Sequence, residues 1–423
     1  MSNLRFIHAA DLHLGSPMQK LESYPGAPAD QMRNATKDAV HNLVDLAIDH
    51  QVNALLIAGD IYDCQWKDIG IGLWLMEQMR RLEQNGIMVC LIRGNHDAIS
   101  VVRNSIPWPK NVIELPSDRA ATQLLECGLA VHGQSFAREA VTEDLAAGYP
   151  DAKSGYFNVG LLHTSLSGNS EHDRYAATNL HVLRQRGYDY WALGHIHMRS
   201  EKSVDPQGTW VGYSGNTQGR SVRECGAKGC YLIDVKNGSA ANIEFLPTDV
   251  ARWHIVEVDL TDVETLSDLT NATKRRMQQL QAQVLDRTLA IRIQMTGRTK
   301  LHAEASKPKF KSDVDLAIRN AANELGKMWI EKIQFATSIH RSAQVQKDFD
   351  EVVQQLKVTF DAIEHDESFL RDFDSQVAIL KKHAGDVLSD NIWSKPAAEV
   401  LPSLKESSIN LLASELESPG GSQ

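Results

Sequence analysis

The sequence predicts an α/β protein, and two observations lead to this prediction. Up to about residue 250, short apolar or β-branched runs alternate with helical patterns, and the runs end in Gly, Asp, His or Asn. Strand, helix and strand follow one another at the spacing of βαβ units, which build parallel sheets. A chain of 423 residues has room for two or three domains.

The elements of the first part follow in order. Strands are predicted at residues 4–10, 54–60, 88–94, 129–135, 158–164 and 190–195. Helical patterns at residues 31–50 and 70–86 connect the first three, and Gly86 stands where a helix C-cap is expected. Residues 209–216, 229–235 and 242–247 predict a closing section that is rich in hairpins.

A boundary is predicted near residues 246–253, which gives domains at 1–250, 251–342 and 343–423. The second domain has the pattern of a small βαβαβ module, with helices over residues 266–285 and 313–326. The third is helical over residues 349–364 and 369–385.

Composition narrows the class of protein. No apolar run reaches the roughly 18–20 residues of a membrane span, and five cysteines without a framework spacing indicate reduced thiols in a cytoplasmic protein. The net charge is −10, but residues 252–344 carry +4 and residues 345–423 carry −8. The acidic total therefore does not exclude DNA as a partner of the middle segment, and a nucleoid-associated location is compatible with it.

Five predicted strands end in residues that bind metals. The stretches are AADLH, AGDIYD, RGNHDA, LLHTS and GHIH, and their candidate ligands are Asp11, His13, Asp60, Asn95, His163, His195 and His197. Each stretch alone would be an ordinary turn or cap. Five of them at strand ends instead predict one shared site, and donors without sulfur favour manganese, iron, zinc or magnesium.

In this order, D-x-H, G-D-x-x-D, G-N-H-D, a strand-terminal His and G-H-x-H resemble the calcineurin-like metallophosphoesterases, over roughly residues 4–235. HAADLHLGSP, LLIAGDIYD, LLHTSL and the added basic module resemble the SbcD-type DNA repair nucleases within that superfamily. YSGNTQGRSVRECGAKGCYLIDV is similar to the YhaO-type branch. The resemblance implies a four-layer α/β/β/α sandwich, a smaller α/β capping domain and a helical C-terminal tail.

The resemblance also implies a division of the ligands between two divalent metals, with manganese expected. Asp11, His13 and His197 would bind one ion, while Asn95, His163 and His195 would bind the other, and Asp60 would bridge both. His96 is then the candidate acid or charge stabiliser for the leaving oxygen, with Asp63 or Asp97 as its partner. Some DNA-processing relatives have a histidine in the place of Asp63, so this residue is either an orienting group or a helix cap.

The function implied is a metal-dependent DNA exonuclease or endonuclease that acts on ends or single strands. Its implied partner is an SMC-like ATPase of the SbcC or YhaN type. The helical tail at residues 343–423 would be the docking segment for this partner, and the alternative is a tail that packs on its own domain. Residues 69–79 lie either in the core or at a homodimer interface. Candidate DNA-contacting residues are Arg220 and Arg223, near Lys228, and the loop-like stretch of Lys307, Lys309 and Lys311. The alternatives are a phosphoesterase of the same fold that acts on a nucleotide or phosphoprotein, and a catalytically silent scaffold for an ATPase.

Overall fold

The computed structural model describes residues 4–16, 28–63, 68–98, 106–166, 175–200, 203–204, 208–284, 286–339, 343–384 and 396–417. The chain divides into two compact units. The first comprises Met1–Val256, Arg276–Ile293 and Arg319–Ile333, and the second comprises Glu257–Arg275, Gln294–Ile318 and Gln334–Gln423. All seven candidate ligands belong to the first unit. The predicted domain limits at residues 250 and 342 stay a prediction.

The first unit contains two six-stranded sheets. The first sheet has the order β12-β11-β1-β2-β3-β4, with β1 (Leu4–Ala9), β2 (Ala54–Ala58), β3 (Met88–Ile92), β4 (Val112–Glu114), β11 (Gly229–Lys236) and β12 (Ser239–Pro247). The second has the order β5-β6-β7-β8-β10-β9, with β5 (Ala121–Leu125), β6 (Leu129–Gly133), β7 (Phe157–His163), β8 (Tyr190–Gly194), β9 (Ser203–Val204) and β10 (Trp210–Tyr213). Strands β1, β2 and β3 run parallel, as do β6, β7 and β8. The predicted βαβ units are therefore confirmed.

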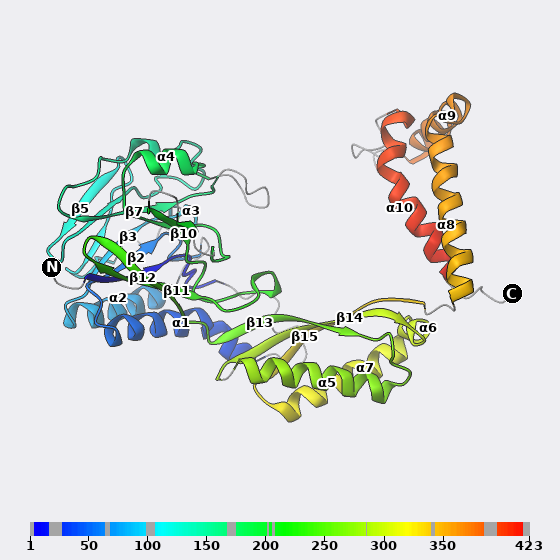
Figure 1. The fold of residues 1–423 in the computed structure, drawn as a ribbon, viewed down its shortest axis with the longest axis horizontal. Helices are drawn as coiled ribbons and strands as arrows, with labels where there is room; N and C mark the ends of the chain where they lie inside the picture. Colours follow the sequence, from blue (N-terminus) through cyan, green and yellow to red (C-terminus); the bar gives the residue numbers. More distant parts are fainter. Residues whose placement is uncertain are drawn as a thin grey trace. The chain divides into compact units, whose positions relative to one another are not determined.

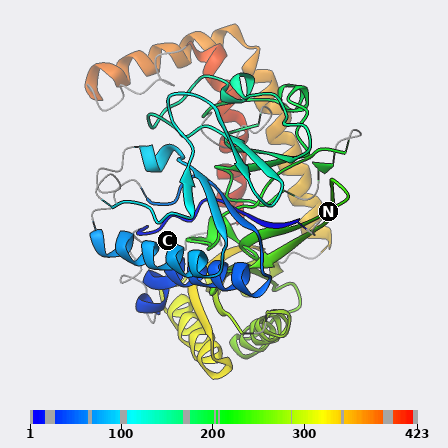
Figure 2. The ribbon, with the colours of Figure 1, turned by 90° about the vertical axis from the view of Figure 1, so that its left-hand side faces the viewer.

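Helices cover the outer faces of both sheets. Helix α1 (Ala29–Asp49) and helix α2 (Ile69–Gln84) lie side by side on the first sheet, as Figures 1 and 2 show. The second sheet is covered more thinly, by α4 (Leu180–Gln185) and the short 3₁₀ helix Leu145–Gly148. This arrangement confirms the α/β/β/α sandwich.

Alternation along the strands explains the layers. Phe6 of β1 is packed between the two sheets, whereas its neighbour Ile7 is packed under α1 and α2, because successive side chains of a strand point to opposite faces. In α2, Leu75 and Met79 are buried in the core, while Leu73 is 56% exposed. The apolar helix predicted at residues 69–79 therefore belongs to the core and also leaves apolar side chains at the surface.

The remaining elements follow the sequence pattern. Strands β13 (Ala251–Asp259), β14 (Thr288–Thr299) and β15 (Met328–Ile339) form a three-stranded sheet, and α5 (Leu266–Gln283) and α7 (Pro308–Leu325) connect them. The last helices are α8 (Ala343–Glu364), α9 (Glu367–Ala384) and α10 (Ala397–Glu417), and these three contact one another. Among the helices in the described residues, none is long and apolar enough to span a bilayer.

Candidate metal centre

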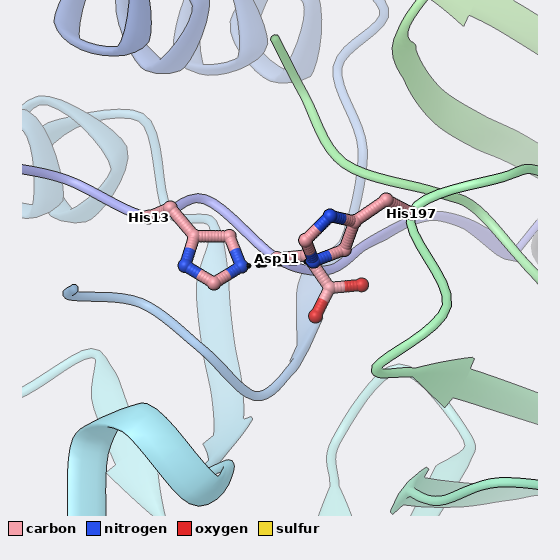
Figure 3. Close-up of side chains that lie close together, drawn as sticks. All are labelled: Asp11, His13 and His197. Carbon is pink, nitrogen blue, oxygen red and sulfur yellow. Dashed lines mark hydrogen bonds between the residues drawn. The ribbon is translucent and has the colours of Figure 1, made fainter. Parts of the chain in front are cut away.

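The carboxyl ends of five strands bring the candidate ligands together. Asp11 follows β1, Asp60 follows β2, and Asn95 begins the short helix α3 (Asn95–Ala98) after β3. From the second sheet, His163 is the last residue of β7, and the GHIH stretch follows β8. Parallel strands place their carboxyl ends at the same edge, and the two sheets are packed face to face. The side chains therefore meet from both sheets, as Figure 3 shows for Asp11, His13 and His197.

Asp60 occupies the middle of the group. One of its carboxylate oxygens, Oδ2, lies 3.4 Å from Nε2 of His163 and 3.8 Å from Nε2 of His13. The other, Oδ1, accepts a hydrogen bond from the backbone N–H of His96 at 3.0 Å. This one carboxylate therefore faces an imidazole of each expected metal site, which is the position that a bridging ligand requires.

The imidazoles face one another without a full set of hydrogen-bond partners. Nε2 of His13 lies 3.0 Å from Nε2 of His197, and Nδ1 of His13 is buried with no hydrogen-bond partner among the described residues. Burial, together with the positive charges of Arg220 and the neighbouring histidines, lowers the pKa of His13 well below its ordinary value. The ring is thus neutral and carries a nitrogen lone pair, and this arrangement fits a cation.

The charge of the buried group leads to the same conclusion. Although burial lowers it, the charge and hydrogen bond of Asp60 and the charge of Asp11 raise the pKa of His163 to about 9. A positive charge is therefore favoured between the two buried carboxylates, and a divalent cation would satisfy them better than a proton does. The carboxylate, imidazole and amide donors fit manganese, iron, zinc or magnesium.

The backbone at these ligands is unusual. Among the described residues, nine that are not glycine have positive φ, and four of the nine are candidate ligands: Asp11 (53°), His13 (45°), Asp60 (51°) and His195 (96°). Residues other than glycine rarely adopt this left-handed region of φ, and backbone strain of this kind is concentrated at functional sites. Local sequence gives no sign of it.

His195 contacts two of the other candidate ligands, Asp11 and His163. Its backbone N–H donates to both oxygens of Asp11, at 3.0 and 3.1 Å, and its ring packs edge-on against His163 with centroids 5.2 Å apart. Among the described residues, three groups of side chains lie close enough together to hold a metal ion: Asp11 with His13 and His197, Asp11 with Asp60 and His163, and His13 with Asp60 and His96. Asn95 lies beside them, with Oδ1 3.0 Å from Nε2 of His163.

The comparisons with known proteins agree with this geometry. Residues 4–199 match the family described as calcineurin-like phosphoesterase. These residues form a calcineurin-like phosphoesterase domain. Residues 253–338 match the middle domain of the metallophosphoesterase YhaO. The resemblance predicted from the motifs is therefore confirmed.

Two curated relatives give the breadth of the similarity. The chain is 35% identical over 273 residues to the uncharacterized metallophosphoesterase YhaO of Bacillus subtilis, covering 64% of this chain and 66% of that protein. It is 24% identical over 277 residues to the DNA double-strand break repair protein Mre11 of Sulfurisphaera tokodaii, covering 62% and 67%. The match to YhaO thus spans slightly less than two thirds of that relative. Among solved structures, the protein TT1561 of Thermus thermophilus matches with a TM-score of 0.35 and 11% identity, over 58% of this chain and 100% of that one.

In the phosphoesterase domain, glycines make room for the ligands. A Cβ on Gly94 would lie 2.2 Å from Oδ1 of Asp60, and a Cβ on Gly59 would lie 2.5 Å from Nδ1 of His163. A Cβ on Gly194 would lie 1.9 Å from the carbonyl oxygen of Ala58. The glycine of each G-D, G-N and G-H motif is therefore required by close packing at the site.

Two ligand histidines of the phosphoesterase domain are oriented through Nδ1. In His163, Nδ1 donates to the carbonyl oxygen of Ala58 at 2.9 Å, and in His197, Nδ1 donates to Oε1 of Glu224 at 2.7 Å. Both bonds leave Nε2 available to a metal. Sequence reasoning missed Glu224, which lies 27 residues beyond His197 and has no motif of its own.

His96 has Asp63 as its partner. Nδ1 of His96 lies 3.4 Å from Oδ1 of Asp63, whereas the buried carboxylate of Asp97 accepts backbone N–H groups of Ile61, Tyr62 and Gly94. Asp97 thus shapes the loop after β2, and a catalytic role for it stays a prediction. The helix-cap alternative for Asp63 is also wrong for α2, because Asp68 caps that helix.

The basic residues that were candidates for DNA contact lie in different surroundings. Arg220 lies within the site, and Arg223 is exposed in the same turn. Lys228 is buried, and its Nζ donates to the carbonyl oxygen of His197 at 2.7 Å, so it supports the ligand loop instead of a substrate. Lys307, Lys309 and Lys311 are exposed in the second unit. Their stretch is not a loop, because Pro308 begins α7 in the position that proline favours.

Proposed function

We propose that this phosphoesterase is a two-metal DNA nuclease, an exonuclease or endonuclease, and that manganese is its preferred ion. The observation that supports the chemistry is the buried group of two carboxylates and several imidazoles around Asp60. The similarity to Mre11 proteins, over 62% of the chain in one case, supports DNA as the substrate. The exposed Arg223, in the turn beside the site, supplies a cationic group of the kind that a phosphate backbone attracts.

Each residue has a role in this proposal. The seven candidate ligands, Asp11, His13, Asp60, Asn95, His163, His195 and His197, would hold the ions. The bound ions would activate a water and neutralise the phosphate oxygens. Although burial lowers it, the close contact and charge of Asp63 and the charge of Asp60 raise the pKa of His96 above its ordinary value. A raised pKa favours the protonated form of His96, which at the edge of the site can protonate the leaving oxygen.

The experiment is a cleavage assay on end-labelled linear DNA with manganese, magnesium or EDTA. His96→Ala runs alongside, and bis-p-nitrophenyl phosphate serves as a small diester. We expect manganese-dependent cleavage of DNA that the variant lacks. Hydrolysis of the small ester with intact DNA would instead favour a nucleotide or phosphoprotein phosphoesterase. No hydrolysis of either substrate would favour a scaffold.

We also propose that the helical tail binds the coiled coil of an SMC-like ATPase, and that the nuclease works as a homodimer. Apolar side chains remain exposed on the tail, with Val352 at 46%, Val358 at 51% and Ile379 at 48%. Such side chains suit a helix-on-helix interface. Val352→Glu with Val358→Glu should abolish co-elution with an ATPase of this class and leave small-ester hydrolysis unchanged. Co-elution of the variant would contradict the tail as the docking element.

A further inference from the structure

One arginine connects two carboxylates on either side of the candidate metal centre. A terminal nitrogen of Arg220, NH2, lies 3.1 Å from Oε1 of Glu224, and the other, NH1, lies 3.7 Å from Oδ2 of Asp63. The backbone N–H of Arg220 donates to Oε2 of Glu224 at 2.7 Å. The arginine side chain is only 20% exposed, so solvent screens these contacts less than it would at the surface.

The contact between Arg220 and Glu224 bears on which nitrogen of His197 carries the proton. Nδ1 of His197 lies 2.7 Å from Oε1 of Glu224 and 3.2 Å from NH2 of Arg220. A guanidinium can only donate, so a bond from Arg220 to Nδ1 would leave the ring proton on Nε2 and prevent metal binding there. With the carboxylate nearer, Nδ1 carries the proton and Nε2 is free. Arg220 favours this state because it holds Glu224 with both its backbone and its side chain.

The contact between Arg220 and Asp63 connects the arginine to His96, the residue proposed to protonate the leaving oxygen. Asp63 contacts NH1 of Arg220 through Oδ2 and faces Nδ1 of His96 through Oδ1. Asp63 therefore lies between the Arg220 guanidinium and the His96 ring and has a defined orientation toward His96. The planar guanidinium can serve both carboxylates at once, whereas a lysine ammonium has a different shape and would not reach both in the same way.

We propose that Arg220 is a positioning residue that braces Glu224 and Asp63 together, so that His197 presents Nε2 to the metal while His96 keeps its orientation. The inference rests on the metal-dependent hydrolysis proposed above, but it does not depend on DNA as the substrate. Arg220 acts on every phosphodiester through the metal site, and this role differs from a contact with the DNA backbone. The two roles predict different measurements.

The test compares Arg220→Met, Glu224→Gln and the double variant with the wild type. Manganese affinity is measured by calorimetry on the full chain without substrate. Loss of a partner that orients a metal ligand costs about 10–100-fold in affinity, so we expect each single variant to bind manganese at least about 10-fold more weakly. The double variant should bind manganese no more weakly than Glu224→Gln alone, because both changes remove the same contact between Arg220 and Glu224. Effects that multiply in the double variant would overturn the coupling.

The second readout is hydrolysis of bis-p-nitrophenyl phosphate at saturating manganese. We expect kcat to fall in Arg220→Met with little change in KM, and Arg220→Lys to recover only part of the loss. If Arg220→Met keeps wild-type manganese affinity and small-ester kcat, and shows only a raised KM and a weaker salt dependence on DNA, then Arg220 is a DNA contact and the inference is wrong.

Arg5→Met is the matched control. Arg5 forms an ion pair with Asp234 at 2.5 Å, at the opposite end of β1 from Asp11, so its loss removes an arginine–carboxylate pair away from the site. It should keep wild-type manganese affinity, and melting curves report whether each variant is folded. If Arg220→Met does not fold, Arg220→Lys takes its place, and wild-type affinity in that variant would overturn the inference. A wild-type protein that binds no manganese would instead refute the proposed function itself.

Discussion

Gly94→Ala should disable the metal site through a single methyl group. A Cβ at this position would lie 2.2 Å from Oδ1 of Asp60 and 2.8 Å from both Cγ and the backbone nitrogen of Asp60. Ordinary contact begins near 3.4 Å, so the carboxylate or the β3 loop must move by a little more than 1 Å. The carboxylate cannot turn away freely, because Oδ1 accepts the backbone N–H of His96.

The size of the effect follows from this displacement. A misplacement of about 1 Å at an active site can cost on the order of 10²-fold in rate, and overpacking costs roughly 1–3 kcal/mol of stability. We therefore expect small-ester kcat/KM to fall about 100-fold and manganese to bind more weakly at both positions. The protein should still fold, with a melting temperature lowered by several degrees, on the order of 2–4 °C per kcal/mol.

Calorimetry with manganese, ester hydrolysis and thermal melts measure the three quantities. Gly148→Ala is the control, because a Cβ on Gly148 meets nothing within 4 Å. It should match the wild type in metal affinity and rate. Two manganese ions bound to Gly94→Ala with wild-type affinity would refute the reasoning, because the bridging carboxylate would then tolerate the displacement.

Three further predictions concern the same site. Asp60→Ala should lose tight binding of both ions together, because one carboxylate faces both positions, and two fully occupied metals by elemental analysis would show that the bridge is misassigned. His96→Ala should keep its metal content and lose about 10²–10⁴-fold in kcat, whereas loss of both metals would make His96 a ligand. Manganese at 100 times its dissociation constant should stabilise the protein by about 2.7 kcal/mol relative to EDTA-treated protein, and equal melting temperatures would contradict a native metal site.

Much of the site could be predicted because it is written in short local motifs. Asp11, Asp60 and His163 each stand at the end of an apolar run, and parallel strands bring such ends to one edge whatever the details of packing. Whether Asp63 or Asp97 accompanies His96 was beyond the sequence. Both carboxylates are close to the site along the chain, and only the path of the loop after β2 decides that Asp97 turns to the backbone.

The sequence by itself determined the α/β class, the parallel strands and the residues that gather at their ends, because periodicity and strand-end motifs are local properties. Only the tertiary structure decided which polar groups contact and orient those residues. Glu224, Arg220 and Lys228 reach His197 from a turn that lies more than 20 residues away in the chain, and no periodicity encodes such contacts. The positive φ of Asp11, His13, Asp60 and His195 has the same origin, because strained backbone is held only by the packing of the finished fold.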